Sequence, residues 1–470
     1  MKTINSALIR RLMLLCGLAV LGGVHASEVK VGVASVDITP PLGIPMAGYY
    51  HLRGADGVLD PLFSKAMVIE SDGGRAVLVT LDLISITREI TDQARVLIGK
   101  ATGIPADRVM ISATHAHTGP QLAGRGAASR DLGGQQAMTL AYSEALPAKI
   151  SESVGTAVDR LQAAQLSAAR GRCENLTFNR RYFMRDGTVG WNPGKLNPNI
   201  AMAAGPSDPE LGVLYVARAG AADPRESLAT FVNFAMHPDT CGGTKISADW
   251  PGALGRVLAG YHGESHLTLV ANGTCGNLNH IDCGWGWPQG SAIEQYRIAT
   301  ILGAAVFQSY KDLKPLAGPL PVRARSTTVE LDLPEIPPGE LEEAQRTIQL
   351  TKDDAGGNFM RLVQSYRTLD VADRQGQPHQ VEVQVIALGA DVAWVSLPGE
   401  IFVELGLAIK KRSPFRHTFL VELANESIGY IPDRRSFAEG NYEPVSARCA
   451  PGSGERLVEA AVTLLQSFNP

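Results

Sequence analysis

Histidines follow two strongly apolar segments of the chain. His115 and His117 come directly after Val109–Ala113, and His237 comes at the end of Ala229–Met236. In an extended segment residues i and i+2 point to the same face, so the first two imidazoles can share a metal ion, or one can bind it while the other contacts substrate. The chain has only ten histidines in 470 residues, so this clustering favours a site over a pair of surface side chains.

A third apolar segment, Val392–Leu397, leads to a carboxylate at Glu400. Two imidazoles, one carboxylate and a water molecule form a known catalytic zinc arrangement. In α/β proteins the loops at the carboxyl ends of strands carry the chemistry, because the sheet aims them into one crevice. Glu400 also begins a helical pattern over Ile401–Arg412, where a carboxylate can simply complement the helix dipole. Spacing alone leaves both interpretations of Glu400 open.

Two further features lie near these segments. Asp249 can accept a hydrogen bond from a metal-bound imidazole, or it can cap the helix expected to begin near Pro251. The glycine-rich loop Gly273–His280 offers backbone N–H groups and amide side chains that can stabilise an oxyanion, although an ordinary tight turn explains it equally well. The loop lacks the spacing of a phosphate loop or a dinucleotide fingerprint.

The positions of these candidate site residues are set by strands and helices, which are expected to alternate along the chain. Nearly continuous apolar runs predict central strands covered on both faces, at Val29–Val36, Ala76–Leu83, Arg108–Ala113, Gly212–Ala217, Ala229–Met236, Leu267–Ala271, Val381–Leu388, Val392–Leu397 and Phe419–Leu423. Amphipathic patterns predict helices at Thr91–Thr102, Gln136–Leu161, Pro251–Tyr261, Ser291–Tyr310, Pro338–Lys352 and Gly454–Phe468. A hairpin is expected to turn at Gly389–Asp391. Prolines between 334 and 338 break the chain, and we expect an inserted helical and hairpin section there within one catalytic domain.

Composition excludes several classes of protein. Charged residues make up 19% and hydrophobic residues 45%, which is typical of globular proteins. The net charge of −4 and the lack of a basic stripe give no indication of nucleic-acid binding. After the N-terminal segment, no stretch is long and apolar enough to span a bilayer.

The N-terminus has the pattern of a secretory signal. Basic residues up to Arg11 precede an apolar run from Leu12 to Val20, and small residues end at Ala26. This pattern predicts a signal peptide over residues 1–26, with residues 27–470 as a mature chain that is secreted or periplasmic.

Five cysteines remain in the mature chain, at Cys173, Cys241, Cys275, Cys283 and Cys449. Cys275 and Cys283 are near enough in sequence to close a small loop, but spacing does not determine the pairing. No C-x-x-C spacing occurs, which argues against a zinc site made of cysteines.

Together these segments resemble the neutral/alkaline non-lysosomal ceramidase family, in its N-terminal catalytic domain. The most specific matches are the histidine motif Thr114–Pro120 and Pro398-Gly399-Glu400. The other segments that carry the likeness are Val31–Ala34, Asp37–Pro41, Ala47–Tyr49, Leu81–Leu83, Asn179–Arg181, His237–Pro238 and Tyr442–Glu443. The resemblance covers nearly the whole mature chain and implies an α/β fold with a mixed β-sheet core and surrounding helices.

The resemblance also implies a zinc site. The family binds one zinc ion through two histidines, a glutamate and a tyrosine, which fall here on His115, His237, Glu400 and Tyr430. The second histidine of the pair acts near the reacting carbonyl in the family, and this role falls on His117.

Two features depart from the family pattern. The family's Gly-Asp-Val-Ser-Pro-Asn loop carries a catalytic serine, and the matching position is Asn279. Asparagine is a poor nucleophile, although its N–H can still stabilise an oxyanion. The chain also ends soon after Tyr442, where full-length ceramidases continue into an immunoglobulin-like domain. Both departures bear on ceramide as the substrate more than on the zinc site.

We therefore expect a zinc-dependent amidohydrolase that cleaves an N-acyl or lipid-like substrate with zinc-activated water. His117 is expected to act as general acid/base or to contact the oxyanion, and Tyr430 to be a fourth zinc ligand or an oxyanion donor. Asn279 and the Gly276 loop are expected to take the stabilising role left by the absent serine. One alternative is a zinc hydrolase of another substrate class, an esterase or a carbohydrate-directed deacylase. A second alternative is a secreted binding protein that kept the metal and lost the chemistry with the serine. The oligomeric state is not determined by these patterns.

Overall fold

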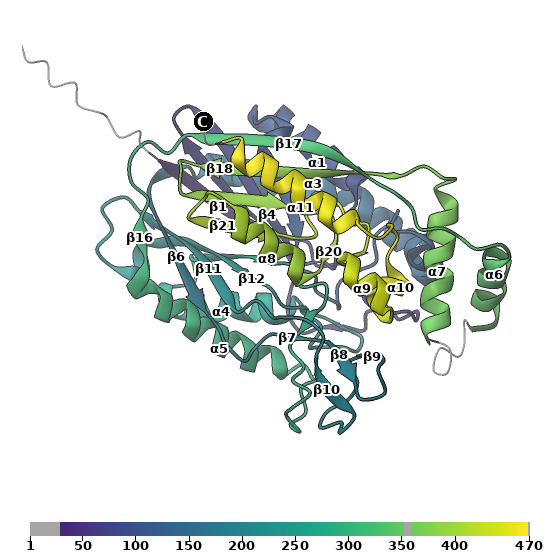
Figure 1. Cartoon of the computed structure of the whole chain (residues 1–470). Coiled ribbons are helices and arrows are strands. Elements are labelled where there is room, and N and C mark those ends of the chain that lie inside the picture. Colours follow the sequence, from purple (N-terminus) through teal and green to yellow (C-terminus); the bar gives the residue numbers. More distant parts are fainter. Residues whose placement is uncertain (1–28, 352–358, 469–470) are drawn as a thin grey trace, which may run out of the picture.

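The computed structural model describes residues 29–351 and 359–468. The expected signal peptide, residues 1–26, lies outside the described residues. Figure 1 shows layered sheets with helices packed on their outer faces. The mixed α/β class predicted from the sequence is confirmed.

The largest sheet has nine strands. Its order is β14 (Leu267–Asn272), β12 (Ser227–Phe234), β11 (Glu210–Arg218), β6 (Gln162–Arg172), β1 (Lys30–Asp37), β3 (Phe63–Ser71), β4 (Gly74–Leu81) and β5 (Val109–Ala113), with β16 (Lys314–Pro315) paired to β6. The outer pairs β12–β14 and β4–β5 are parallel, and the pairs between them are antiparallel. The loops that carry the histidines follow β5 and β12. Each of these strands belongs to a parallel pair, so both loops begin at the carboxyl end of a parallel strand.

A second sheet of four strands has the order β17 (Val322–Leu331), β18 (His379–Leu388), β19 (Val392–Ser396) and β21 (His417–Val421). The residues that follow β21 join both edges of the large sheet. The Glu422 N–H donates to Asn272 O of β14 at 3.1 Å, and Leu423 O accepts from the Ala113 N–H of β5 at 3.1 Å. The two edges of the large sheet therefore meet at the end of β21, and the strand ends that precede the site residues lie together.

Three pairs of helices cover the outer faces of these sheets. The pairs are α1 (Arg88–Thr102) with α3 (Ala137–Asp159), α4 (Asp249–His262) with α5 (Glu294–Ser309), and α8 (Val403–Arg412) with α11 (Ser453–Gln466). Each helix pair packs against a hydrophobic cluster of its own. A further hydrophobic cluster lies between the two sheets and includes Leu78, Phe231, Trp394 and Phe419. Burial on both faces explains why the strands have almost no polar alternation.

The remaining elements are short or lie outside the main layers. They are β2 (Gly57–Val58), β7 (Phe178–Asn179), β8 (Arg181–Met184), β9 (Val189–Trp191), β10 (Ile200–Ala203), β13 (Lys245–Ile246), β15 (Leu278–Asn279), β20 (Glu400–Ile401), β22 (Tyr430–Ile431), α2 (Ala127–Ser129), α6 (Glu340–Thr351), α7 (Phe359–Asp373), α9 (Arg434–Glu439) and α10 (Tyr442–Ser446). Helices α6 and α7 leave β17 and return to β18, and these two strands pair along their full length. The inserted helical section thus begins and ends within one sheet.

Most of the expected elements are confirmed, including the hairpin of β18 and β19. The strands β3, β6 and β17 and the helix α7 were not predicted. In β6 the sequence is rich in alanine, glutamine and arginine, which favour a helix in isolation. It forms a strand because β1 and β11 pair with its two sides, so tertiary context overrides local preference.

All five described cysteines are free thiols, so the Cys275–Cys283 loop is not closed by a disulfide. Among residues 29–351 and 359–468, no helix is both long enough and apolar enough to cross a membrane.

Trp394 tests the core between the sheets. Its side chain is 1% exposed and contacts the rings of Phe231 and Phe419. Trp394→Ala is expected to lower the free energy of unfolding by about 3–5 kcal/mol, because it removes apolar contacts and leaves a cavity. Trp287, which is 61% exposed, is the matched control, and Trp287→Ala should change stability by less than about 0.5 kcal/mol in urea titrations. Equal effects of the two variants would contradict a core between the sheets.

Candidate metal centre

The backbone at His115 turns sharply where β5 ends. Its φ is +75°, a left-handed conformation that is uncommon outside glycine. The turn is held by the N–H groups of His115 and Ala116, which both donate to Leu83 O at 2.9 and 3.2 Å. The extended geometry predicted for this pair is wrong, but His115 and His117 still meet, with ring centroids 4.7 Å apart. Strained backbone of this kind persists where the surroundings impose it, and functional sites are enriched in it.

Backbone carbonyls fix the tautomers of two histidines. The Nδ1–H of His115 donates to Ile84 O at 2.8 Å, and the Nδ1–H of His237 donates to Cys275 O at 2.9 Å. In its neutral form each ring then carries its lone pair on Nε2, which is the form of imidazole that binds a metal. Burial opposes a charge on His115, but the nearby Glu400 outweighs burial and raises the pKa of this imidazole. Burial lowers the pKa of His237 to about 3, so this ring is neutral at neutral pH.

Asp249 does not take the role of hydrogen-bond acceptor for a ligating imidazole. Its carboxylate accepts hydrogen bonds from the Thr240 hydroxyl and from the backbone N–H groups of Thr240, Cys241 and Trp250. It closes the loop between β12 and α4 at the first residue of that helix. This prediction was wrong because carbonyls of neighbouring loops, which no sequence pattern reveals, reach the imidazoles first.

Glu400 is placed by close approach of three backbone segments. Its strand β20 pairs in parallel with β22, with Glu400 opposite Tyr430. On the other side lies Gly276, where an added Cβ would lie 2.5 Å from Glu400 O. The buried Glu422 carboxylate accepts from the N–H groups of Cys275 and Ile401 at 3.1 and 2.9 Å. It thereby joins the loop that holds His237 to the strand that carries Glu400.

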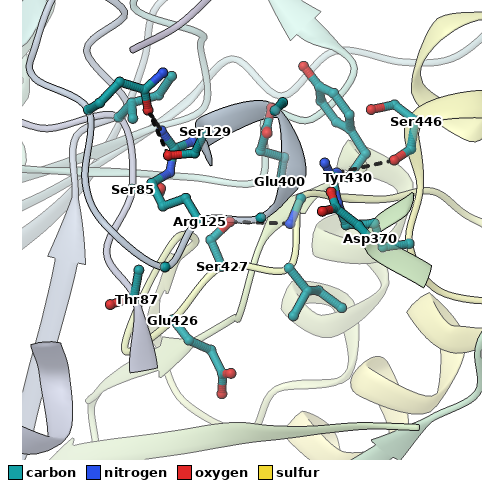
Figure 2. A pocket seen from close by; sticks show the side chains of 18 of the residues that line it. Ser85, Thr87, Arg125, Ser129, Asp370, Glu400, Glu426, Ser427, Tyr430 and Ser446 are labelled. Carbon is teal, nitrogen blue, oxygen red and sulfur yellow. Dashed lines mark hydrogen bonds and ion pairs between the residues drawn. The ribbon is translucent and has the colours of Figure 1, made fainter. Parts of the chain in front are cut away.

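Three lone-pair atoms converge at this place. His115 Nε2 lies 3.1 Å from His237 Nε2, and Glu400 Oε2 lies 3.3 Å from each nitrogen. Glu400 Oε2 is buried and accepts no hydrogen bond. Such atoms repel one another unless a proton or a metal ion lies among them, and donor atoms around a tetrahedral zinc ion are separated by roughly 3.3 Å. The donor atoms and their spacing therefore fit a zinc ion. Glu400 also lines the adjoining cavity (Figure 2).

His117 is the third member of a group of histidines whose ligand atoms lie within 4.8 Å of one another. Its Nε2 lies 3.3 Å from His115 Nε2, but its Nδ1 faces a carboxylate, Asp239 Oδ1, at 3.7 Å instead of a carbonyl. Asp239 also accepts a hydrogen bond of 2.5 Å from the Tyr49 hydroxyl. Burial lowers the pKa of His117 to about 4, so its imidazole is neutral at neutral pH.

The sequence-based interpretation missed Asp239 and Tyr49 as site residues. The sequence did offer one signal for each residue. Asp239 lies two residues after His237, and Tyr49 lies in a segment that carries the family resemblance, so both could have been named as neighbours of the site. Gly48 explains how the two segments approach. Its φ is +107°, and an added Cβ would lie 2.5 Å from His117 O.

Tyr430 lies beside Glu400 and lines the same cavity (Figure 2). Its hydroxyl accepts a hydrogen bond from Arg180 Nη2 at 3.1 Å, and Arg180 is held by the fully buried Glu443 at 2.7 Å. Burial raises the pKa of Tyr430 well above its ordinary value, and the charge of Glu400 adds to this shift. The tyrosine is therefore a neutral O–H group directed by a fixed arginine.

Asn279 lies in β15, one residue after Leu278, whose carbonyl accepts the N–H of His237 at 3.3 Å. Its side-chain amide donates to Asn192 Oδ1 at 3.0 Å, and its oxygen accepts from the Ile281 N–H. Asn279 is not among the residues that line the cavity of about 830 Å³ beside the histidines.

Comparison with known proteins agrees with this geometry. Residues 29–241, which include all three histidines, match the family described as neutral/alkaline non-lysosomal ceramidase, N-terminal. The expected resemblance to the ceramidase family is confirmed. A search of curated proteins gave no match.

Solved ceramidases have the same fold. The neutral ceramidase from Pseudomonas aeruginosa is 20% identical, with a TM-score of 0.72, and a structure described as ceramidase complexed with C2 is 19% identical, with a TM-score of 0.74. Each match covers 94% of this chain and 75% of the other. At these identities the likeness shows the fold alone.

Gly276 tests whether the close approach at Glu400 positions the metal ligands. Gly276→Ala is expected to displace β20 and to weaken metal binding about 10- to 100-fold, as changes that support ligands typically do. Gly290 is exposed and has open space around it, so Gly290→Ala is the matched control. Competition with a coloured chelator measures both affinities. Unchanged affinity in Gly276→Ala would show that the approach does not position the ligands.

His115 tests the donor set directly. His115→Ala is expected to reduce bound metal from about one ion per chain to near zero, because it removes one of the donor atoms that converge there. His262 is equally buried but lies on α4, where its Nε2 contacts the Tyr310 hydroxyl, so His262→Gln should retain the metal. Metal content by mass spectrometry decides the outcome. Full metal content in His115→Ala would remove this residue from the donor set.

Proposed function

We propose that this protein is a zinc-dependent hydrolase of an N-acyl amide bond and that it acts in a secreted or periplasmic setting. The observation that carries the proposal is the convergence of three lone-pair atoms from His115, His237 and Glu400 beside a cavity. The ceramidase-family match over residues 29–241 supports an amide as the bond that is cleaved. The N-terminal sequence pattern supports export.

The residues divide into those that hold the metal and those that handle protons and charge. His115, His237 and Glu400 would hold zinc, with Tyr430 as a fourth ligand or as a hydrogen-bond donor to the substrate oxygen. A bound zinc ion supplies Lewis acidity, which polarises a carbonyl and lowers the pKa of a water molecule.

His117 is the proton carrier of the proposed site. Its neutral imidazole can accept a proton from the attacking water and then donate it to the nitrogen of the departing amine. Asp239 faces the other ring nitrogen and stabilises the imidazolium that forms in between. Arg180 keeps the Tyr430 hydroxyl directed, so that an O–H group is available where negative charge develops.

The substrate class is a second part of the proposal. Ceramide is the substrate that the names of the similar structures suggest, and a non-sphingolipid amide or an ester is the alternative. The absence of the family serine at Asn279 requires direct attack by water in either case. A binding protein without turnover is disfavoured by His117, because a metal that only stabilises the fold does not require a proton carrier beside it.

A chelator and one variant test the proposal. Zinc-loaded protein should cleave a fluorogenic short-chain ceramide or another N-acyl amide, and removal of the metal with a chelator should abolish cleavage. His117→Gln should lower kcat by about 10²–10⁴-fold with zinc content unchanged, because it removes proton transfer alone.

Three results of this experiment would each exclude a different statement. Cleavage that survives chelation would exclude metal-dependent hydrolysis. Wild-type activity in His117→Gln would exclude its role as proton carrier. Cleavage of esters but of no amide would move the protein to the esterase alternative.

A further inference from the structure

The cavity beside the metal centre is rich in arginine. Five arginines and four carboxylates line it; they are Arg88, Arg125, Arg130, Arg374, Arg448, Asp370, Asp373, Glu400 and Glu426. Many of the other lining side chains are hydroxyls or amides, including those of Ser85, Gln121, Ser129, Gln135 and Ser427. Apolar and aromatic side chains also line the cavity, among them Tyr50, Ile84, Leu132, Val381 and Ile428. The cavity therefore offers apolar surface for an acyl chain together with charged groups for a polar end of the ligand.

Three of the carboxylates are already paired. Arg88 contacts Glu426 at 2.5 Å, Arg130 contacts Asp373 at 2.5 Å, and Arg448 contacts Asp370 at 2.6 Å. The fourth, Glu400, faces the imidazoles of the metal centre.

The two other arginines differ from each other. Arg374 donates to the backbone carbonyls of Gln377 and Pro378 at 2.9 and 2.7 Å, so its guanidinium is occupied within its own loop. Arg125 makes a single long hydrogen bond, from Nη1 to Gln121 Oε1 at 3.4 Å. No described carboxylate lies within ion-pair distance of Arg125. Its remaining N–H groups are free to meet a ligand.

The loop that presents Arg125 is built into the protein. The neighbouring Gly126 has a φ of +103°, and an added Cβ there would lie 2.6 Å from Asp370 Oδ1. The same carboxylate accepts the N–H of Ala127 at 2.5 Å and pairs with Arg448 through its other oxygen. Asp370 thus anchors the loop with both oxygens occupied, which leaves Arg125 without an acidic partner.

The electrostatics of the cavity favour a negatively charged ligand. Burial lowers the pKa of Arg125 to about 10, so the guanidinium remains charged at neutral pH. Arg448 disfavours that charge, and Glu400 favours it. A zinc ion held by Glu400 would offset that carboxylate and leave the cavity with excess positive charge. Arg125 is half-buried and no described carboxylate neutralises it, so an anionic ligand is the natural complement.

We infer that the substrate of this site is an N-acyl compound that carries a carboxylate, which Arg125 binds. The inference rests on the proposed function and narrows its substrate class from neutral lipids to anionic amides. For an N-acyl amino acid, water adds to the amide carbonyl, the C–N bond breaks, and a proton moves to the departing nitrogen. The products are a carboxylic acid and the free amino acid, with no other reactant consumed.

Binding of two probes that cannot be hydrolysed tests the inference without turnover. In 4-oxononanoate a methylene replaces the nitrogen of N-hexanoylglycine, and in 1-hydroxynonan-4-one it replaces the nitrogen of N-hexanoylethanolamine. Calorimetry on zinc-loaded protein should give at least about tenfold tighter binding of the carboxylate probe, since a hydrogen bond to a charged group contributes roughly 1.5–3 kcal/mol.

Variants assign this preference to one residue. Arg125→Gln should remove it, and Arg125→Lys should retain part of it. Arg130 lines the same cavity but is paired with Asp373, so Arg130→Gln is the matched control and should change the preference less than about twofold. Zinc content is measured on every variant, and unchanged content separates a lost anion contact from a damaged metal centre.

The binding measurements decide whether Arg125 binds a carboxylate. Equal affinity for the two probes, no binding of the carboxylate probe, or an unchanged preference in Arg125→Gln would overturn the inference. Turnover of N-hexanoylglycine and N-hexanoylethanolamine is measured separately. Failure to cleave any amide would overturn the proposed function, and the binding preference would still decide whether Arg125 binds an anion.

Discussion

The structure depends on the hydrogen bonds that join the end of β21 to both edges of the large sheet. The bonds from Ala113 to Leu423 and from Glu422 to Asn272 bring β5 and β14 to one place, although they lie at opposite ends of the strand order. Without this junction, the loops after β5 and β12 would end on separate parts of a curved surface. With it, side chains more than a hundred residues apart in sequence come within about 3 Å of one another.

Asn425 strengthens this junction. It adopts a left-handed φ of +65°, which asparagine tolerates better than most residues. Its backbone N–H donates to Ile111 O at 2.7 Å, and its side-chain oxygen accepts from the Ile111 N–H at 3.0 Å. Its side-chain nitrogen donates to Glu382 and Gln384 of β18 at 3.0 Å. A fully bonded polar network inside the protein admits few alternative arrangements, so β5 is held firmly where the strained His115 begins.

Two environments meet at one cavity. On the side of the imidazoles, carbonyls and carboxylates converge and favour a cation. On the side of the cavity, the loop anchored by Asp370 presents a guanidinium without an acidic partner. A divalent ion held beside the imidazoles and the Arg125 guanidinium would together attract an acyl compound with a negative end, and His117 is the proposed proton carrier beside them. The proposed cation site, anion site and proton carrier thus lie around one cavity, as hydrolysis of a charged amide would require.

The amino-acid sequence by itself determined the class of fold, most of the strands and helices, and the types of ligand at three strand ends. These follow from local rules, because apolar periodicity and residue chemistry are properties of short segments. The tertiary structure alone decided that β6 is a strand, that carbonyls and not Asp249 orient the imidazoles, and that Asp239 faces His117. It also decided that, among the described residues, no carboxylate lies within ion-pair distance of Arg125. Each of these depends on which distant segments come within hydrogen-bonding distance, and pairing between distant strands, not local preference, sets those distances.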